Sequence, residues 1–109
     1  MATIIKQKET FRRVLQCTDL KSGAVLDLTG CAAFSQMRKY PGGELLGTAQ
    51  CTVHEKKGEI EVLWTASQTE YFPLGNAGYD VWLTFEGDQK PIYTEAVEII
   101  MGYTENIGE

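Results

Sequence analysis

The chain has 109 residues, of which 15 are acidic and 10 are basic, so its formal net charge is −5. Its length suits one domain, and a hydrophobic share of 43% is typical of a folded protein rather than a disordered one. An acidic chain is poorly suited to neutralising phosphates, and the apolar runs are too short to cross a bilayer. We therefore expect no nucleic-acid or membrane partner. We predict one domain over residues 1–109, with residues 1–8 and 105–109 as flexible or edge segments.

Alternation of apolar and polar residues, the pattern of a strand with one buried face, recurs along the chain. Residues 11–18 have strand character without a clear register. In residues 31–38 we expect Cys31, Ala33 and Ser35 to point inward, while Phe34, Gln36 and Arg38 point outward. The inward sets expected on the later segments are Ala49, Cys51 and Val53; Ile60, Val62 and Trp64; Tyr79, Val81, Leu83 and Phe85; and Val97, Ile99 and Met101.

Turn chemistry separates these segments. Glycines, among them Gly58 and the pair Gly75–Asn76, supply the positive φ angles that tight connections need, and Pro91 is expected to open the last strand. No long stretch has helical periodicity. One short helical turn is indicated by Ser67-Gln68-Thr69-Glu70, in which Ser67 and Glu70 have the spacing of a capping box.

Together these patterns predict an all-β fold, an immunoglobulin-like β-sandwich of about seven or eight antiparallel strands with one short helical turn. A small barrel is the alternative. Tyr79 precedes the core position Val81 by two residues, the place of a tyrosine that in such sandwiches bonds back to the chain. No disulfide is needed, and the three cysteines, Cys17, Cys31 and Cys51, are expected to stay reduced.

The sequence offers little for catalysis. The one histidine, His54, has no nucleophile or orienting partner at a recognisable spacing, and on a strand it would face away from Cys51. The glycine-rich stretches lack the spacing and lysine of a phosphate loop. We expect no enzyme activity, no catalytic residue, no metal and no cofactor.

Outward-facing aromatic residues are the clearest sign of a contact surface. Trp82 lies on the polar face of its segment, Phe34 points outward, and Tyr93 and Tyr103 are candidates for a rim. Three explanations are open, namely cover by a loop or terminal segment, a protein–protein interface, and a carbohydrate platform built on Trp82 and Tyr93.

Several short motifs occur in an order found in a known family. Asp27-Leu28-Thr29-Gly30, followed by Ser35-Gln36-Met37-Arg38, is the first, and Tyr79-Asp80-Val81-Trp82-Leu83 is the last. Between them come Gly58-Glu59-Ile60-Glu61-Val62 and Thr65-Ala66-Ser67-Gln68-Thr69. Over residues 10–104 this succession resembles the small structural domains of tailed phages and prophages, which are immunoglobulin-like β-sandwiches. It is similar to the N-terminal domain of phage baseplate upper proteins.

The resemblance implies a non-enzymatic virion component of the tail, neck or baseplate, made in the cytoplasm of the bacterial host. Its implied partners are other virion proteins and further copies of itself. The family's glycine near the final strand is here Ala96. A carbohydrate-binding module on a particle or cell surface is the alternative function.

Two groups of residues carry these expectations. The candidate interface consists of Trp82, Phe34, Arg38 and Tyr93. The candidate structural motif consists of Asp27, Thr29, Gly30, Tyr79 and Asp80. We expect an Asx-type turn at Asp27, a positive φ at Gly30, and a charge pair between Arg38 and the Tyr79–Asp80 segment.

Overall fold

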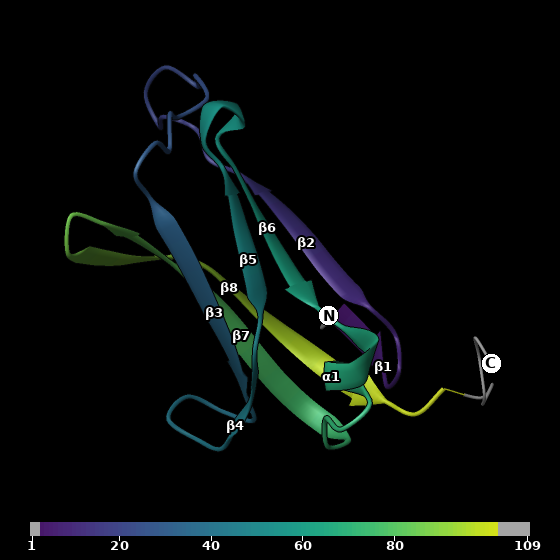
Figure 1. Ribbon diagram of the computed structural model, residues 1–109. Coiled ribbons are helices and arrows are strands. Elements are labelled where there is room, and N and C mark those ends of the chain that lie inside the picture. Colours follow the sequence, from purple (N-terminus) through teal and green to yellow (C-terminus); the bar gives the residue numbers. More distant parts are fainter. Residues whose placement is uncertain (1–2, 103–109) are drawn as a thin grey trace.

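The computed structural model describes residues 3–102, which form eight strands in two sheets and two short helical turns (Figure 1). The five-stranded sheet has the order β1-β8-β7-β3-β4, and the three-stranded sheet has the order β2-β6-β5. The strands are β1 (Thr3–Lys6), β2 (Phe11–Gln16), β3 (Ala32–Arg38), β4 (Leu45–Thr48), β5 (Gln50–His54), β6 (Glu59–Trp64), β7 (Gly75–Phe85) and β8 (Asp88–Ile100). The turns are the 3₁₀ helix η1 (Glu55–Lys57) and the α-helix α1 (Ala66–Thr69).

The strand order is that of an immunoglobulin-like sandwich. In that fold, strands B, E and D share one sheet, and strands C, F and G share the other. Strands β2, β6 and β5 take the first set of places here, β3, β7 and β8 take the second, and β4 extends the second sheet. The predicted all-β sandwich is therefore confirmed.

The first strand departs from the predicted antiparallel pattern. β1 pairs with β8 in parallel, with Thr3 opposite Val97 and Lys6 opposite Ile100. The chain then crosses to the other sheet, where β2 begins at Phe11, so β1 lies on the open edge of β8. Residues 3–6 are thus an edge strand. Residues 105–109 and Tyr103 lie outside the described residues.

Two strand boundaries differ from the sequence interpretation. Gly75 was expected in a turn but begins β7, where its φ of 113° is open to glycine alone. Pro91 does not open the last strand, because β8 already begins at Asp88. It lies opposite Trp82 at an irregularity in the β7–β8 pairing, where a missing N–H disturbs the ladder least.

The helical turn begins two residues earlier than predicted. Thr65, rather than Ser67, is the N-cap of α1, and its side chain accepts a hydrogen bond from the backbone N–H of Gln68. The Gln68 side chain in turn accepts from the N–H of Thr65 at 2.9 Å. The predicted box of Ser67 and Glu70 is wrong, because the chain leaves β6 at Thr65 with the extended backbone that an N-cap requires.

The core lies between the two sheets. Eight of the sixteen predicted inward residues are buried there, and six more are half-buried. The other two, Phe85 and Met101, are exposed because they lie at the ends of the sandwich. Trp64, Phe72 and Tyr79 form its centre through edge-on ring contacts near 6 Å. The buried apolar residues are Ile5, Phe11, Leu28, Met37, Ile60, Val62, Trp64, Phe72, Ala77, Tyr79, Val81, Val97 and Ile99.

Candidate functional site

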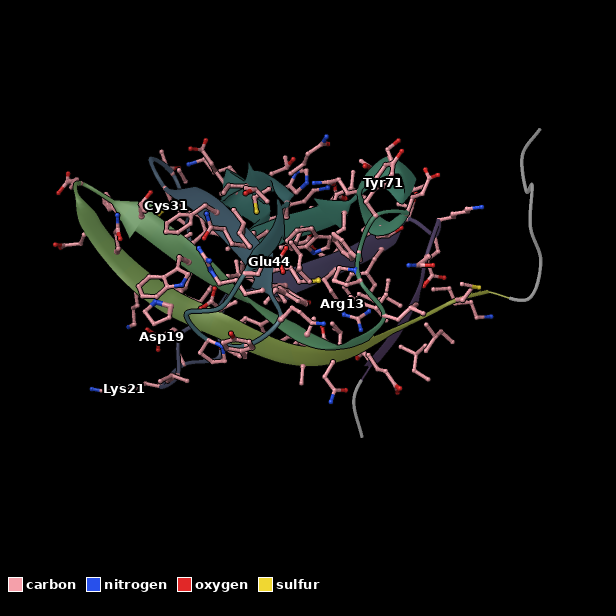
Figure 2. All side chains as sticks on the ribbon, turned by 90° about the horizontal axis from the view of Figure 1, so that it is seen from below. Arg13, Asp19, Lys21, Cys31, Glu44 and Tyr71 are labelled. Atoms are coloured by element: carbon pink, nitrogen blue, oxygen red, sulfur yellow. The ribbon has the colours of Figure 1, made fainter. Side chains whose placement is uncertain are left out.

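A hollow of about 520 Å³ lies on the outer face of the five-stranded sheet, on the side away from the core. Figure 2 shows the two sheets as layers, with Arg13 between them. Gly78 and Ala96 are neighbours across β7 and β8 and line the hollow. Because these two residues carry at most a methyl group, the middle of the sheet stays low while larger side chains stand around it. The whole lining comprises Phe34, Gln36, Arg38, Lys39, Tyr40, Pro41, Gly42, Ala77, Gly78, Tyr79, Asp80, Trp82, Thr94, Glu95 and Ala96.

Three of the four predicted interface residues line this hollow. Phe34 lies opposite Trp82 in the β3–β7 ladder, and their rings are stacked with centroids 6.1 Å apart and an interplanar angle of 14°. Arg38 follows two residues after Gln36 along β3, on the same face. The period of two in β3 brings these side chains together, as the sequence predicted.

Tyr93 lies on the other face of the sheet. It is opposite Val81, a core residue, and its ring packs against buried Tyr79 with centroids 6.2 Å apart. The predicted carbohydrate platform of Trp82 and Tyr93 is therefore wrong, because the two side chains lie on opposite faces of the sheet. The aromatic neighbour of Trp82 on the outer face is Phe34.

The predicted charge pair between Arg38 and Asp80 is not formed. Arg38 Nη1 donates to the carbonyl oxygen of Gly43 at 2.8 Å, and Nη2 donates to Gln36 Oε1 at 3.0 Å. The ladder places Asp80 opposite Gln36 instead, so Arg38 fastens the β3–β4 loop beside the hollow. Among the described residues, no side chain or backbone group donates a hydrogen bond to the Asp80 carboxylate.

On the inner face, a polar network joins the two sheets, and its central residue, Glu95, was not among the residues predicted from the sequence. Glu95 on β8 accepts hydrogen bonds from Arg13 of β2, at 3.1 Å from Nε and 3.0 Å from Nη2. Its carboxylate also accepts from the hydroxyl groups of Thr3 and Tyr79, each at 2.5 Å. The Tyr79 hydroxyl thus bonds to a side chain rather than back to the backbone. Glu95 faces inward because it lies directly opposite Tyr79, and that position follows from the β7–β8 register and not from the local sequence.

This network shifts the ionisation of both of its acidic members. Burial alone would raise the pKa of Glu95, but hydrogen bonds from Arg13, Thr3 and Tyr79 outweigh burial and lower that pKa to about 2. Burial, together with the hydrogen bond to Glu95, raises the pKa of Tyr79 above its ordinary value. Glu95 therefore stays ionised as a structural brace between the sheets.

The motif at Asp27 forms the predicted turn. Asp27 Oδ1 accepts from the backbone N–H of Thr29 at 2.9 Å and from its hydroxyl at 2.5 Å, and Gly30 has a φ of 83°. The hydroxyl and N–H of Thr29, with Lys56 Nζ at 3.1 Å, lower the pKa of Asp27 to about 2. The N–H of Gly30 donates to Glu55 at 2.9 Å. The motif thus orders the loop before β3.

The remaining reactive side chains do not form a site. Burial raises the pKa of Cys17 and of Cys51, which makes these thiols less reactive at neutral pH. Within residues 3–102, no group of three or more histidine, cysteine or acidic side chains could hold a metal ion. The described part of the chain has no helix long and apolar enough to span a membrane.

No model of a protein family matches the sequence, and no curated protein is significantly similar to it.

Proposed function

We propose that this protein is a non-enzymatic structural component of a tailed-phage or prophage particle, in the tail, neck or baseplate, acting through protein–protein contacts. The immunoglobulin-like sandwich supports this role, since it is the fold that the motif resemblance implies. The observation that carries the proposal is the position of exposed apolar side chains at both ends of the sandwich.

One end, which we call the α1 end, holds Tyr71, Leu74 and Met101. These side chains are 81%, 49% and 60% exposed. Gly75 pairs with Ile99 and Lys6 pairs with Ile100, so the residues after α1 and after β8 lie at the same end of the five-stranded sheet (Figure 1).

The other end, the hairpin end, holds Leu20, Val25 and Phe85. Leu20 is fully exposed, and Phe85 lies at the tip of the β7–β8 hairpin, beside Gly30 of the 17–31 loop. Two different apolar patches at opposite ends of one subunit suit a head-to-tail contact. Such a contact closes into a ring when the rotation allows and otherwise extends into a filament. A ring or a filament of this kind is the symmetric assembly that the proposed virion role requires.

The first test is the solution mass of the full chain by light scattering, over a concentration series and at two salt concentrations. We expect a closed oligomer, such as a hexamer or dodecamer. Leu74→Asp at the α1 end and Leu20→Asp at the hairpin end should each lower the mass to that of a monomer. An equimolar mixture of the two variants should recover a heterodimer, because each retains one of the two complementary ends.

Val14→Asp is the matched control, since Val14 is similarly exposed but lies in the middle of β2, away from both ends. It should keep the wild-type mass. Immunodetection in purified particles then tests the virion role. A chain that stays monomeric at every concentration and is absent from particles would contradict the proposal. The sequence-based prediction that Trp82, Phe34 and Arg38 form a protein interface is tested separately in the same assay. Loss of the oligomer in Trp82→Ala would support it, and an unchanged mass would leave this surface free for another ligand.

A further inference from the structure

We propose that the hollow on the outer face of the five-stranded sheet binds a neutral saccharide, with the Phe34–Trp82 pair as its apolar wall. This surface is separate from the two ends that the proposed assembly uses, so the inference goes beyond that function. It rests on the shape of the hollow, the stacked rings, and the mixture of polar groups.

The shape suits a small ring-shaped ligand. A volume of about 520 Å³ lies within the range of small-molecule sites, about 300–1,000 Å³. Gly78 and Ala96 keep the middle of the sheet low, while Tyr40 and Pro41 of the β3–β4 loop stand at one side. Arg38 fixes that loop by its bond to Gly43, so this side of the hollow is formed without a ligand.

The aromatic wall offers the surface that sugar rings use. Phe34 and Trp82 lie opposite each other on β3 and β7 with nearly parallel ring planes, and both line the hollow. Phe34 remains 38% exposed. The C–H faces of a pyranose ring are apolar, and they pack on aromatic rings, which bury much area at low entropic cost.

The polar groups match hydroxyls better than a charged ligand. Asp80 offers a carboxylate to which no described residue donates, and Gln36 and Arg38 stand in the neighbouring positions of β3. A hydroxyl can donate to the carboxylate and also accept from an amide or guanidinium group. The negative charge of Asp80 disfavours binding of an anion, whereas the positive charges of Arg38 and Lys39 disfavour binding of a cation. The other charged residue of the lining, Glu95, is already neutralised by Arg13 on the inner face.

A peptide strand is a poor occupant of the same hollow. The backbone beneath the middle of the hollow belongs to β7, which is paired by β3 on one side and by β8 on the other. Among the described residues, β1 pairs with β8 only over residues 97–100, and β4 pairs with β3 only over residues 36–38. The remaining free backbone groups of β8 and β3 point along the plane of the sheet at its edges, so an added strand would bond beside the hollow and not inside it. Recognition must come from side chains, as it does for sugars.

The test is a titration of ¹⁵N-labelled full-length protein with the methyl glycosides of glucose, galactose, mannose and N-acetylglucosamine, followed by two-dimensional NMR. We expect at least one glycoside to shift the Trp82 indole N–H and the backbone signals of residues 34–38 and 78–82. Trp82→Ala should weaken that binding at least tenfold. Ala96→Leu, which keeps both rings but fills the hollow, should weaken it as well.

Val14→Ala is the control, since it shortens an exposed apolar side chain of β2, outside the hollow and away from both ends, and should leave the titration unchanged. The inference is overturned if no glycoside shifts these signals, or if Ala96→Leu binds as well as the wild type. It is also overturned if Trp82→Ala is lost from the oligomer or from particles, since the hollow would then be a protein contact. Failure of the proposed virion role looks different, because wild-type protein would then be absent from particles whatever the sugar result.

Discussion

The two faces of the five-stranded sheet are built from alternate residues of the same strands, yet they are organised by different physical rules. On the inner face, Tyr79 and Val81 are buried, and the polar atoms of Glu95 are bonded to groups from β1, β2 and β7. On the outer face, Trp82 is half-buried and Asp80 has no hydrogen-bond donor among the described residues. The carboxylate of the inner face has its hydrogen bonds within the described part of the chain, whereas the carboxylate of the outer face does not.

This difference separates the residues that hold the fold from those that are free to bind. A buried polar group left without a partner costs about 1–3 kcal/mol, so the inner network must be complete. A partly exposed group such as Asp80 is satisfied by water and can exchange that water for a ligand. Substitutions at neighbouring positions on one strand should therefore have opposite consequences for stability and for binding.

The largest difference in the free energy of unfolding is expected between Val81→Asp and Trp82→Asp. Val81 is fully buried, and an unpaired carboxylate there should lower the free energy of unfolding by more than about 4 kcal/mol, enough to unfold many small domains. Trp82→Asp, one residue later on the outer face, should cost less, about 2–3 kcal/mol, because it removes a half-buried ring and its aromatic partner while the new carboxylate stays in contact with water. Urea unfolding followed by circular dichroism compares the two. Equal losses would mean that Trp82 belongs to the core.

Glu95→Gln should have the next largest effect. The amide keeps the size of the side chain but leaves the Arg13 guanidinium without its carboxylate between the sheets. Breaking one partner of a partly buried pair should cost about 2–4 kcal/mol. Arg12→Gln is the matched control, because the pair of Arg12 with Glu61 is on the surface and should contribute less than about 1 kcal/mol. If both variants lose the same stability, the inner network is no stronger than a surface pair.

Low pH should remove the stability that the Glu95 carboxylate contributes. The pKa of Glu95 is about 2 in the folded protein, below its ordinary value of 4.5, so folding favours the ionised carboxylate. The stability that it supplies is therefore complete above pH 4.5 and is lost as the pH falls toward 2. The difference in unfolding free energy between wild type and Glu95→Gln should shrink over that interval. A difference that stays constant down to pH 2 would show that the carboxylate is not the group that titrates.

The periodicity of the sequence was enough to predict the sandwich and to assign the side chains of β3 and β7 to its inner and outer faces. The period of two assigns side chains to faces directly, and Asp27 and Gly30 formed the turn that their chemistry predicts. The parallel pairing of β1 was not accessible, because four residues carry no information about which strand they join. β4 was missed because Leu45-Leu46-Gly47-Thr48 does not alternate.

The candidate site was only partly predictable for a related reason. Phe34, Trp82 and Arg38 share a face because they lie at even spacing or in register. The hollow, however, exists because Gly78 and Ala96 are neighbours across β7 and β8, and that depends on the pairing register. The register near Tyr93 shifts opposite Val81 and Trp82, so the sequence could not tell on which face Tyr93 lies. The role of Glu95 could not be predicted from the sequence either, because it depends on how the fold brings Arg13 of the other sheet next to it.

The smallest effect is the coupling between Phe34 and Trp82, and it tests whether the outer face is organised before any ligand arrives. Stacked aromatic pairs contribute about 0.5–1.5 kcal/mol beyond the area they bury. A double-mutant cycle of Phe34→Ala, Trp82→Ala and both together, measured by urea unfolding, should give a coupling energy in that range. Such a value would mean that each ring holds the other upright, so the apolar wall of the hollow is formed in the free protein. A coupling near zero would mean that the rings move independently, and a ligand would then have to order them at a cost to its affinity.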